Sequence, residues 1–143
     1  TSSLKGLIRL VSDGYSKTSS LGDVLLGQNA RLLQSPPSLE EKIGVRCVLT
    51  PVRDLEDGYS AFLVSPPSPV RLFHLRTKNH TAIYANGREV ETYHPGKGAE
   101  DQLGENMRSL FLSLFPDIER FEDFGALVYP RMSKDTLESL TRY

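Results

Sequence analysis

The length, composition and charge of the chain point to one ordinary folded domain and exclude several other classes of protein. The chain has 143 residues, of which 38% are hydrophobic and 24% are charged, a balance typical of globular domains. Its formal net charge is -1, whereas non-specific binding to nucleic acid needs a strong basic excess. We therefore expect a single domain over residues 1–143 that does not bind nucleic acid.

Membrane insertion and disulfide bonding are also not expected. No apolar run approaches the roughly 18 to 20 residues that span a bilayer. Cys47 is the single cysteine, so it has no partner for an internal disulfide, which fits a reducing compartment. These features predict a cytoplasmic location.

Residues 1–44 are expected to form a helix followed by an irregular segment. Leu4, Leu7, Ile8 and Val11 recur at helical spacing behind serines that can cap a helix, which predicts a short amphipathic helix. Residues 16–38 contain scattered apolar groups among Gly, Asn and Ser, without a sustained period.

Residues 45–98 show the pattern of an antiparallel sheet. Segments rich in β-branched and aromatic residues alternate with turn residues, as strands do. The segments cover residues 45–53, 59–65, 70–76, 81–85 and 88–94. Asn86-Gly87 between the last two favours a type I′ hairpin, because that turn needs positive φ at both central positions. The pattern predicts a meander of about five to six strands.

Residues 99–143 are expected to be mainly helical. The apolar stripe that predicts a helix packed on the sheet consists of Leu103, Met107, Leu110, Phe111 and Leu114. Pro116 ends this helix, and Ser133 can cap a final one, with a further strand at 126–129 between them. Strands grouped before helices give an α+β fold, an antiparallel sheet packed against an amphipathic helix with short flanking helices.

The tetrapeptide Ser35-Pro36-Pro37-Ser38 recurs as Ser65-Pro66-Pro67-Ser68. Consecutive prolines fix φ and remove backbone donors, so both stretches are predicted to be loops. An internal repeat and a pair of proline-directed phosphorylation sites are alternatives. The flanking residues differ, which favours two independent loops.

The chain offers few residues for catalysis or metal binding. None of His74, His80 and His94 has the spacing to another histidine or cysteine that metal ligands usually show. Cys47 could pair with a histidine as an activated nucleophile, but a lone cysteine on a strand is more often a buried small apolar residue. We expect no catalytic residue, no cofactor and no metal.

Basic side chains outnumber acidic ones in the last three predicted strands. The basic residues between residues 70 and 98 are Arg71, Arg76, Lys78, Arg88 and Lys97, against Glu89 and Glu91. On adjacent strands they would form a face suited to an acidic peptide. The alternative is an ordinary set of solvated charges.

Two stretches of the strand region resemble parts of one known family. The first is Leu49-Thr50-Pro51-Val52-Arg53, followed by the apolar strand Ala61-Phe62-Leu63. The second runs from Ile83 to Gly98 through the Asn86-Gly87 turn and Tyr93-His94-Pro95. Together these stretches resemble a polo box, in particular the cryptic polo boxes of the Polo-like kinases. The resemblance covers about a third of the chain.

The resemblance implies a targeting domain without catalytic activity. Such a domain would bind an acidic segment of a protein at a centriole or related cytoskeletal structure, and would form a homodimer. Together with the local charge excess, it makes four residues the candidates for contacting the acidic partner. They are Arg71, Arg76, Lys78 and Arg88.

Two other functions stay open at the level of the sequence. One is a pleckstrin-homology-like module that binds a peptide or a lipid headgroup. The other is a small enzyme that uses Cys47 and a histidine.

Overall fold

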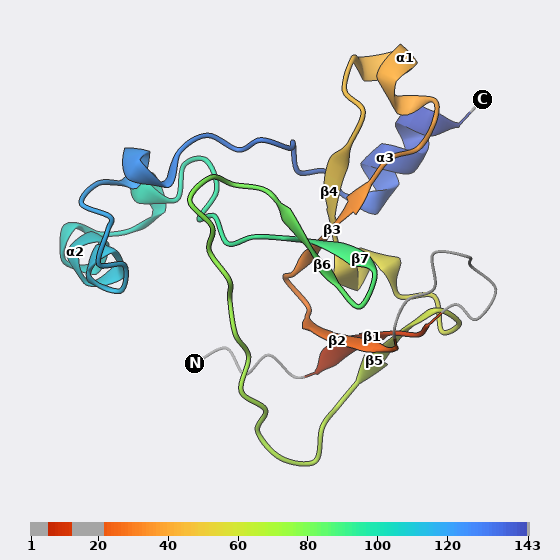
Figure 1. Ribbon diagram of the computed structural model, residues 1–143, viewed down its shortest axis with the longest axis horizontal. Coiled ribbons are helices and arrows are strands. Elements are labelled where there is room, and N and C mark those ends of the chain that lie inside the picture. Colours follow the sequence, from red (N-terminus) through yellow and green to blue (C-terminus); the bar gives the residue numbers. More distant parts are fainter. Residues whose placement is uncertain (1–5, 13–21, 143) are drawn as a thin grey trace. The chain divides into compact units, whose positions relative to one another are not determined.

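A computed structural model describes residues 6–12 and 22–142 of the chain (Figure 1). The chain forms two compact units. Unit 1 comprises Thr1–Phe73, Ala82–Glu91 and Tyr129–Tyr143, and unit 2 comprises His74–Thr81 and Thr92–Val128. The expectation of one domain over the whole chain stays a prediction.

The described residues contain seven short strands, three α-helices and three 3-10 turns. The strands are β1 (Leu7–Leu10), β2 (Val24–Gly27), β3 (Arg31–Gln34), β4 (Val48–Pro51), β5 (Ala61–Val64), β6 (Ala82–Ala85) and β7 (Arg88–Glu91). The helices are α1 (Leu39–Ile43), α2 (Glu105–Ser113) and α3 (Lys134–Thr141), and the 3-10 turns are Val52–Leu55, Glu100–Gln102 and Phe121–Phe124. In the described part of the chain, no helix is long and apolar enough to cross a membrane.

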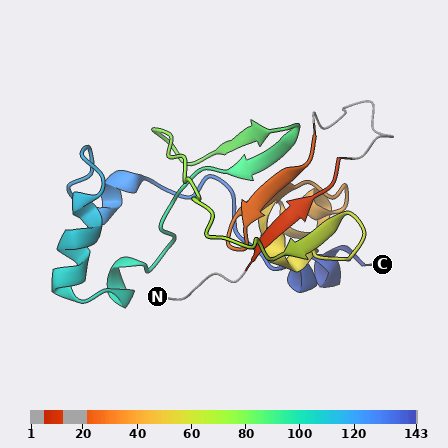
Figure 2. The ribbon, with the colours of Figure 1, turned by 90° about the horizontal axis from the view of Figure 1, so that it is seen from below.

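All seven strands belong to unit 1, where they form two antiparallel sheets. The strand order is β2-β1-β5 in one sheet and β4-β3-β7-β6 in the other, and Figure 2 shows β1 between its two neighbours. The α+β class is therefore confirmed, but the single meander is wrong. Two sheets form because β1 pairs with both β2 and β5, and β3 pairs with both β4 and β7.

Four of the predicted segments differ from the structure. In residues 16–38, which were expected to be irregular, the described part contains β2 and β3. Leu7–Leu10 is a strand rather than part of a helix, and residues 70–76 and 126–129 contain no strand. Leu7, Ile8 and Leu10 are all buried, and such a short apolar run fits a helix or a doubly covered strand equally well. Pairing with distant segments of the chain determines that this run forms a strand and not a helix. Leu4 lies outside the described residues.

The hairpin between β6 and β7 is confirmed. Asn86 and Gly87 both have positive φ, of 48° and 82°, as a type I′ turn requires. The side-chain amide of Asn86 also donates a hydrogen bond to the carbonyl oxygen of Asp23 at 3.1 Å. The Asn86-Gly87 turn therefore has type I′ geometry and is hydrogen-bonded to a second segment of unit 1.

Two clusters of buried side chains hold unit 1 together. The larger cluster draws residues from both sheets and consists of Ile8, Leu10, Val24, Leu32, Val52 and Ala61. The smaller one joins α1, β4 and α3 through Leu39, Val48 and Leu137.

Helix α3 begins as predicted, because the Ser133 hydroxyl accepts a hydrogen bond from the Thr136 amide at 3.2 Å. Beyond β4, the amide of Leu49 donates to Pro130 and its carbonyl oxygen accepts from Met132, so this segment covers the sheet edge.

A nearly buried carboxylate links three segments of unit 1. Glu91, at the end of β7, has a side chain only 7% exposed. Its Oε1 accepts a hydrogen bond from Nη1 of Arg31 at 3.1 Å. The guanidinium of Arg131 binds both of its oxygens, at 2.9 and 3.2 Å. Hydrogen bonds to two arginine side chains offset the free-energy cost of removing this carboxylate from water.

Unit 2 has an aromatic core. Phe111 and Phe121 stack at 5.5 Å between ring centroids, and Tyr93 stacks on Phe115 at 5.6 Å. Phe124 is buried between these pairs. Helix α2 is confirmed, and its packing against the sheet stays a prediction. Phe111 joins the aromatic core, whereas three residues of the stripe are exposed, namely Met107, Leu110 and Leu114.

Replacing Glu91 with Gln is expected to destabilise unit 1 strongly. The substitution leaves Arg31 and Arg131, which are 28% and 19% exposed, without their counter-charge. Removing one partner of a buried ion pair costs about 3 kcal/mol or more. Urea denaturation of E91Q should show this loss, while Glu89→Gln on the same strand should change the midpoint little. Equal midpoints for E91Q and the wild type would contradict the assignment.

The same substitution at two buried threonines is expected to have opposite effects. Thr50 in β4 is fully buried, and its hydroxyl has no hydrogen-bond partner, whereas the Thr92 hydroxyl bonds to the backbone of Thr81. Thr50→Val should therefore raise the free energy of unfolding by about 1 kcal/mol, and Thr92→Val should lower it by about 1 to 3 kcal/mol. Thermal melts followed by circular dichroism measure both. A lower melting temperature for T50V would refute the first half.

Candidate histidine site

Two histidines lie on the continuation of the β6–β7 hairpin into unit 2. Beyond the strands, the Thr92 amide donates to the carbonyl oxygen of Thr81 at 2.8 Å, so the pairing extends by one more step. His80 precedes this pair and His94 follows it in the chain. Their ring centroids are 5.4 Å apart with an interplanar angle of 74°.

His80 is held in one tautomer by the backbone. Its side chain lies in the interior, with the residue only 3% exposed, and its Nδ1 accepts a hydrogen bond from the Val128 amide at 2.8 Å. An amide N–H can only donate, so Nδ1 carries no proton, and the neutral ring has its proton on Nε2. In this hydrogen-bonded arrangement, His80 is the tautomer that carries its proton on Nε2.

His94 uses both ring nitrogens to hold loops of unit 2. Its Nδ1 accepts from the Gly96 amide at 2.9 Å. Its Nε2 must then carry the proton, which it donates to the carbonyl oxygen of Gly125 at 2.8 Å. These contacts assign His94 a structural role.

Two threonine hydroxyls hold the backbone on either side of His80. Thr92 is fully buried, and its Oγ1 accepts from the Thr81 amide at 3.0 Å and lies 3.1 Å from the Thr81 carbonyl oxygen. Thr77 Oγ1 lies 3.2 Å from Thr92 Oγ1 and donates to the carbonyl oxygen of Asn79 at 2.6 Å. The backbone on either side of the hairpin therefore supports the position of His80.

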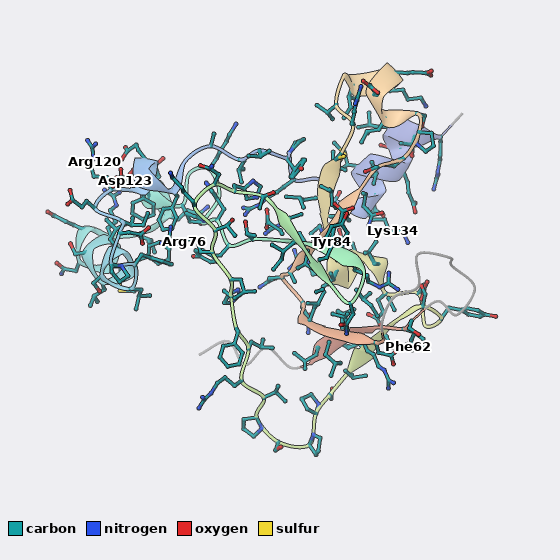
Figure 3. All side chains as sticks on the ribbon, viewed as in Figure 1. Phe62, Arg76, Tyr84, Arg120, Asp123 and Lys134 are labelled. Carbon is teal, nitrogen blue, oxygen red and sulfur yellow. The ribbon has the colours of Figure 1, made fainter. Side chains whose placement is uncertain are left out.

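Arg76 is engaged within unit 2. Its guanidinium forms an ion pair with Asp117 and lies 5.6 Å from the ring centroid of Phe115 and 6.0 Å from that of Phe124. The hydrogen bond from Arg76 holds the pKa of Asp117 below its ordinary value of 3.8. Figure 3 labels Arg76 and Asp123, two of the residues around a shallow depression.

The depression has a volume of about 470 Å³ and is mainly polar. It is lined by Arg76, Thr77, Lys78, Asn79, Asp117, Ile118 and Asp123. The residues from Arg76 to Asn79 lead directly into His80 along the chain. Four of the residues that line this polar depression therefore directly precede His80 in the sequence.

The four basic residues predicted to contact a partner do not form one set. Arg76 and Lys78 line the depression of unit 2, whereas Arg71 and Arg88 belong to unit 1. Arg88 Nη2 donates to the carbonyl oxygen of Val11 at 2.8 Å. Arg71 and Lys78 are exposed. The roles of these residues in binding stay predictions, as do the homodimer and the lack of nucleic-acid binding.

Cys47 has a hydroxyl neighbour. Its Sγ lies 3.1 Å from Oγ of Ser35, and both residues belong to unit 1, whereas the three histidines belong to unit 2. Among the described residues, no group of three or more His, Cys, Asp or Glu side chains could hold a metal ion.

Sequence reasoning missed the burial of His80. Its imidazole is fixed by the amide of Val128, 48 residues away, and a contact at that separation leaves no local pattern. The one signal was positional, since His80 stands just before the strand of a strong hairpin.

Replacing Asp117 with Asn should remove a pH-dependent contribution to stability. The pKa of Asp117 is lowered in the folded state, so its carboxylate stabilises the fold above the unfolded pKa. This contribution is lost as the pH falls through the folded pKa, below about 4. The melting temperatures of the wild type and D117N should therefore differ near neutral pH and converge in acid. Asp101→Asn, at an exposed site of the same unit, is the control, and a difference that grows in acid would contradict the sign.

Comparison with known proteins replaces the resemblance found in the sequence. A family model described as "Hint domain" matches residues 6–97, whereas no curated protein and no solved structure matches the chain. The match overturns the polo-box resemblance, and with it the targeting to a centriole. The stretches that suggested a polo box lie inside the matched segment, and a hairpin with Asn-Gly and β-branched flanks is common to many sheets.

Proposed function

Because the chain belongs to the Hint domain family, we propose that it takes part in the self-processing of a protein backbone. The family is associated with protein splicing and autoprocessing. The matched segment, residues 6–97, includes both sheets of unit 1 and both histidines of the candidate site. This assignment also replaces the pleckstrin-homology-like module and the enzyme based on Cys47.

Self-processing requires a peptide bond of the chain to be opened by a nucleophile. The carbonyl carbon becomes tetrahedral and negative charge develops on its oxygen. The C–N bond then breaks as the leaving nitrogen takes up the proton that the nucleophile gave up. A fixed hydrogen-bond donor aimed at that oxygen lowers the barrier, because the charge is larger in the transition state than in the substrate. The site therefore needs a rigid hydrogen-bond donor at the position of that oxygen.

His80 fits the role of this donor. The observation that carries the proposal is the hydrogen bond from the Val128 amide to Nδ1, which places the ring proton on Nε2. A neutral imidazole can polarise a carbonyl group without gaining or losing a proton. The hydroxyl contacts of Thr92 and Thr77 restrict the backbone near the ring, which favours a fixed donor position.

The reaction would act once on the chain's own backbone. The expectation from the sequence that the protein is not an enzyme stays a prediction.

A fusion protein tests the proposal. The full chain is placed between two reporter proteins of different mass, and shorter products are followed over time by gel electrophoresis and intact-mass measurement. We expect cleavage or splicing in the wild type. His80→Ala should slow it by about 100-fold, the usual effect of removing one donor to a developing oxyanion. The masses of the new chain ends identify the bond that opens and the residue that attacks it.

Two further variants separate a role in the reaction from a role in folding. His80→Gln offers an amide oxygen to Val128 and an N–H donor in place of Nε2, so it should retain more of the rate than His80→Ala. His74→Ala, at an exposed histidine of the same unit, should leave the rate unchanged. A folded wild-type fusion that forms no product under any condition would refute the proposal.

A further inference from the structure

The segment between β5 and unit 2 is exposed along its length. Residues 65–73 contain no strand or helix, and every one of them is exposed. Figure 1 shows this segment, in yellow-green, running out from β5 as a long excursion. Phe73 is 78% exposed and Val70 50%, so the segment presents apolar side chains that it does not use in the core.

The sequence of this segment has the spacing of a ligand for a polyproline-binding groove. Pro66 and Pro69 are three residues apart, and Arg71 follows two residues later. A polyproline II helix has three residues per turn, so the two prolines stand on the same edge. Prolines also fix φ and restrict the residue before them to extended backbone. The chain bends at Pro67 and Ser68, so docking would require rotation at these two residues.

Arg71 adds a free charge at one end of the motif. Its side chain has no ion pair with any described residue, in contrast to Arg76, which is paired with Asp117. Leu72 lies over Gly27, because its Cδ1 is 3.2 Å from the position that a Cβ on Gly27 would take. The motif is therefore presented between two fixed points, the end of β5 and the contact of Leu72.

The other copy of the tetrapeptide, at residues 35–38, has a different structural role. Ser35-Pro36-Pro37-Ser38 leads into α1, where the Leu39 amide donates to the carbonyl oxygen of Pro36 at 3.0 Å. Ser38 and Leu39 are buried. This copy is followed by Leu39 and Glu40 instead of a third proline and an arginine. The fold therefore uses the first copy for a helix start and leaves the second one at the surface.

We propose that Pro66 to Arg71 is a docking site for a partner domain of the SH3 type. Such a domain has an aromatic-lined groove that accepts the two prolines as a polyproline II helix. An acidic residue at the rim of the groove would pair with Arg71. This binding site is independent of the self-processing proposed for His80, because it uses a different segment of the chain.

The test is a titration of the full chain against a panel of purified SH3 domains with acidic or neutral groove rims, followed by calorimetry. Domains with an acidic rim should bind, and binding should weaken with salt. The double variant P66A/P69A should lower the affinity at least about tenfold, and Arg71→Glu should do the same. Because residues 65–73 contribute no buried side chain, the circular dichroism spectra should not change.

The first proline pair supplies the matched control. Pro37→Ala changes an exposed proline in the same tetrapeptide and should leave the affinity unchanged. The His80→Ala variant should also bind as the wild type does, which separates this site from the self-processing reaction. Absence of binding to every domain of the panel, or equal affinities for the wild type and P66A/P69A, would overturn the proposal.

Discussion

The ion-pair network of Glu91 is the interaction on which the rest of the structure depends. A carboxylate that is 7% exposed is stable only because Arg31 and Arg131 bind it. Through it, β3, β7 and the segment before α3 are held together, although they are distant in the sequence. A slip of one residue in β7 would move Glu91 to the opposite face of the sheet. The network therefore fixes the register of the strand that leads directly into Thr92 and His94.

Local features of the fold could be predicted from the sequence. Asn86-Gly87 determines its own turn, and Ser133 determines the start of α3 through a contact three residues away. The sheet topology could not be predicted, because β1 pairs with segments that follow it by about 17 and 54 residues. The sequence of an apolar run such as Leu7 to Leu10 does not show which strands it pairs with.

The candidate site was less predictable than the fold. Counting charges along the strands suggested four equivalent basic residues, but the structure engages Arg76 with Asp117 and Arg88 with a backbone carbonyl oxygen. Glu91 was only counted as an acidic residue of the last predicted strand, although its side chain is 7% exposed. The role of His80 arises from the amide of Val128. The composition shows which charged and polar groups are present. Their chemistry depends on hydrogen-bond and ion-pair partners that come together only in the folded chain.

The two ends of the four-stranded sheet differ in a way that bears on aggregation. The outer side of β4 is covered by residues 130–132, whereas β6 is the last strand at the other end. In a two-residue hairpin, Ala85 and Ile83 bond across to β7, so the backbone groups of Ala82 and Tyr84 point outward. This strand, Ala-Ile-Tyr-Ala, has no charged or proline residue to discourage pairing. It is therefore the end of this sheet at which a partly unfolded or concentrated sample would add a foreign strand.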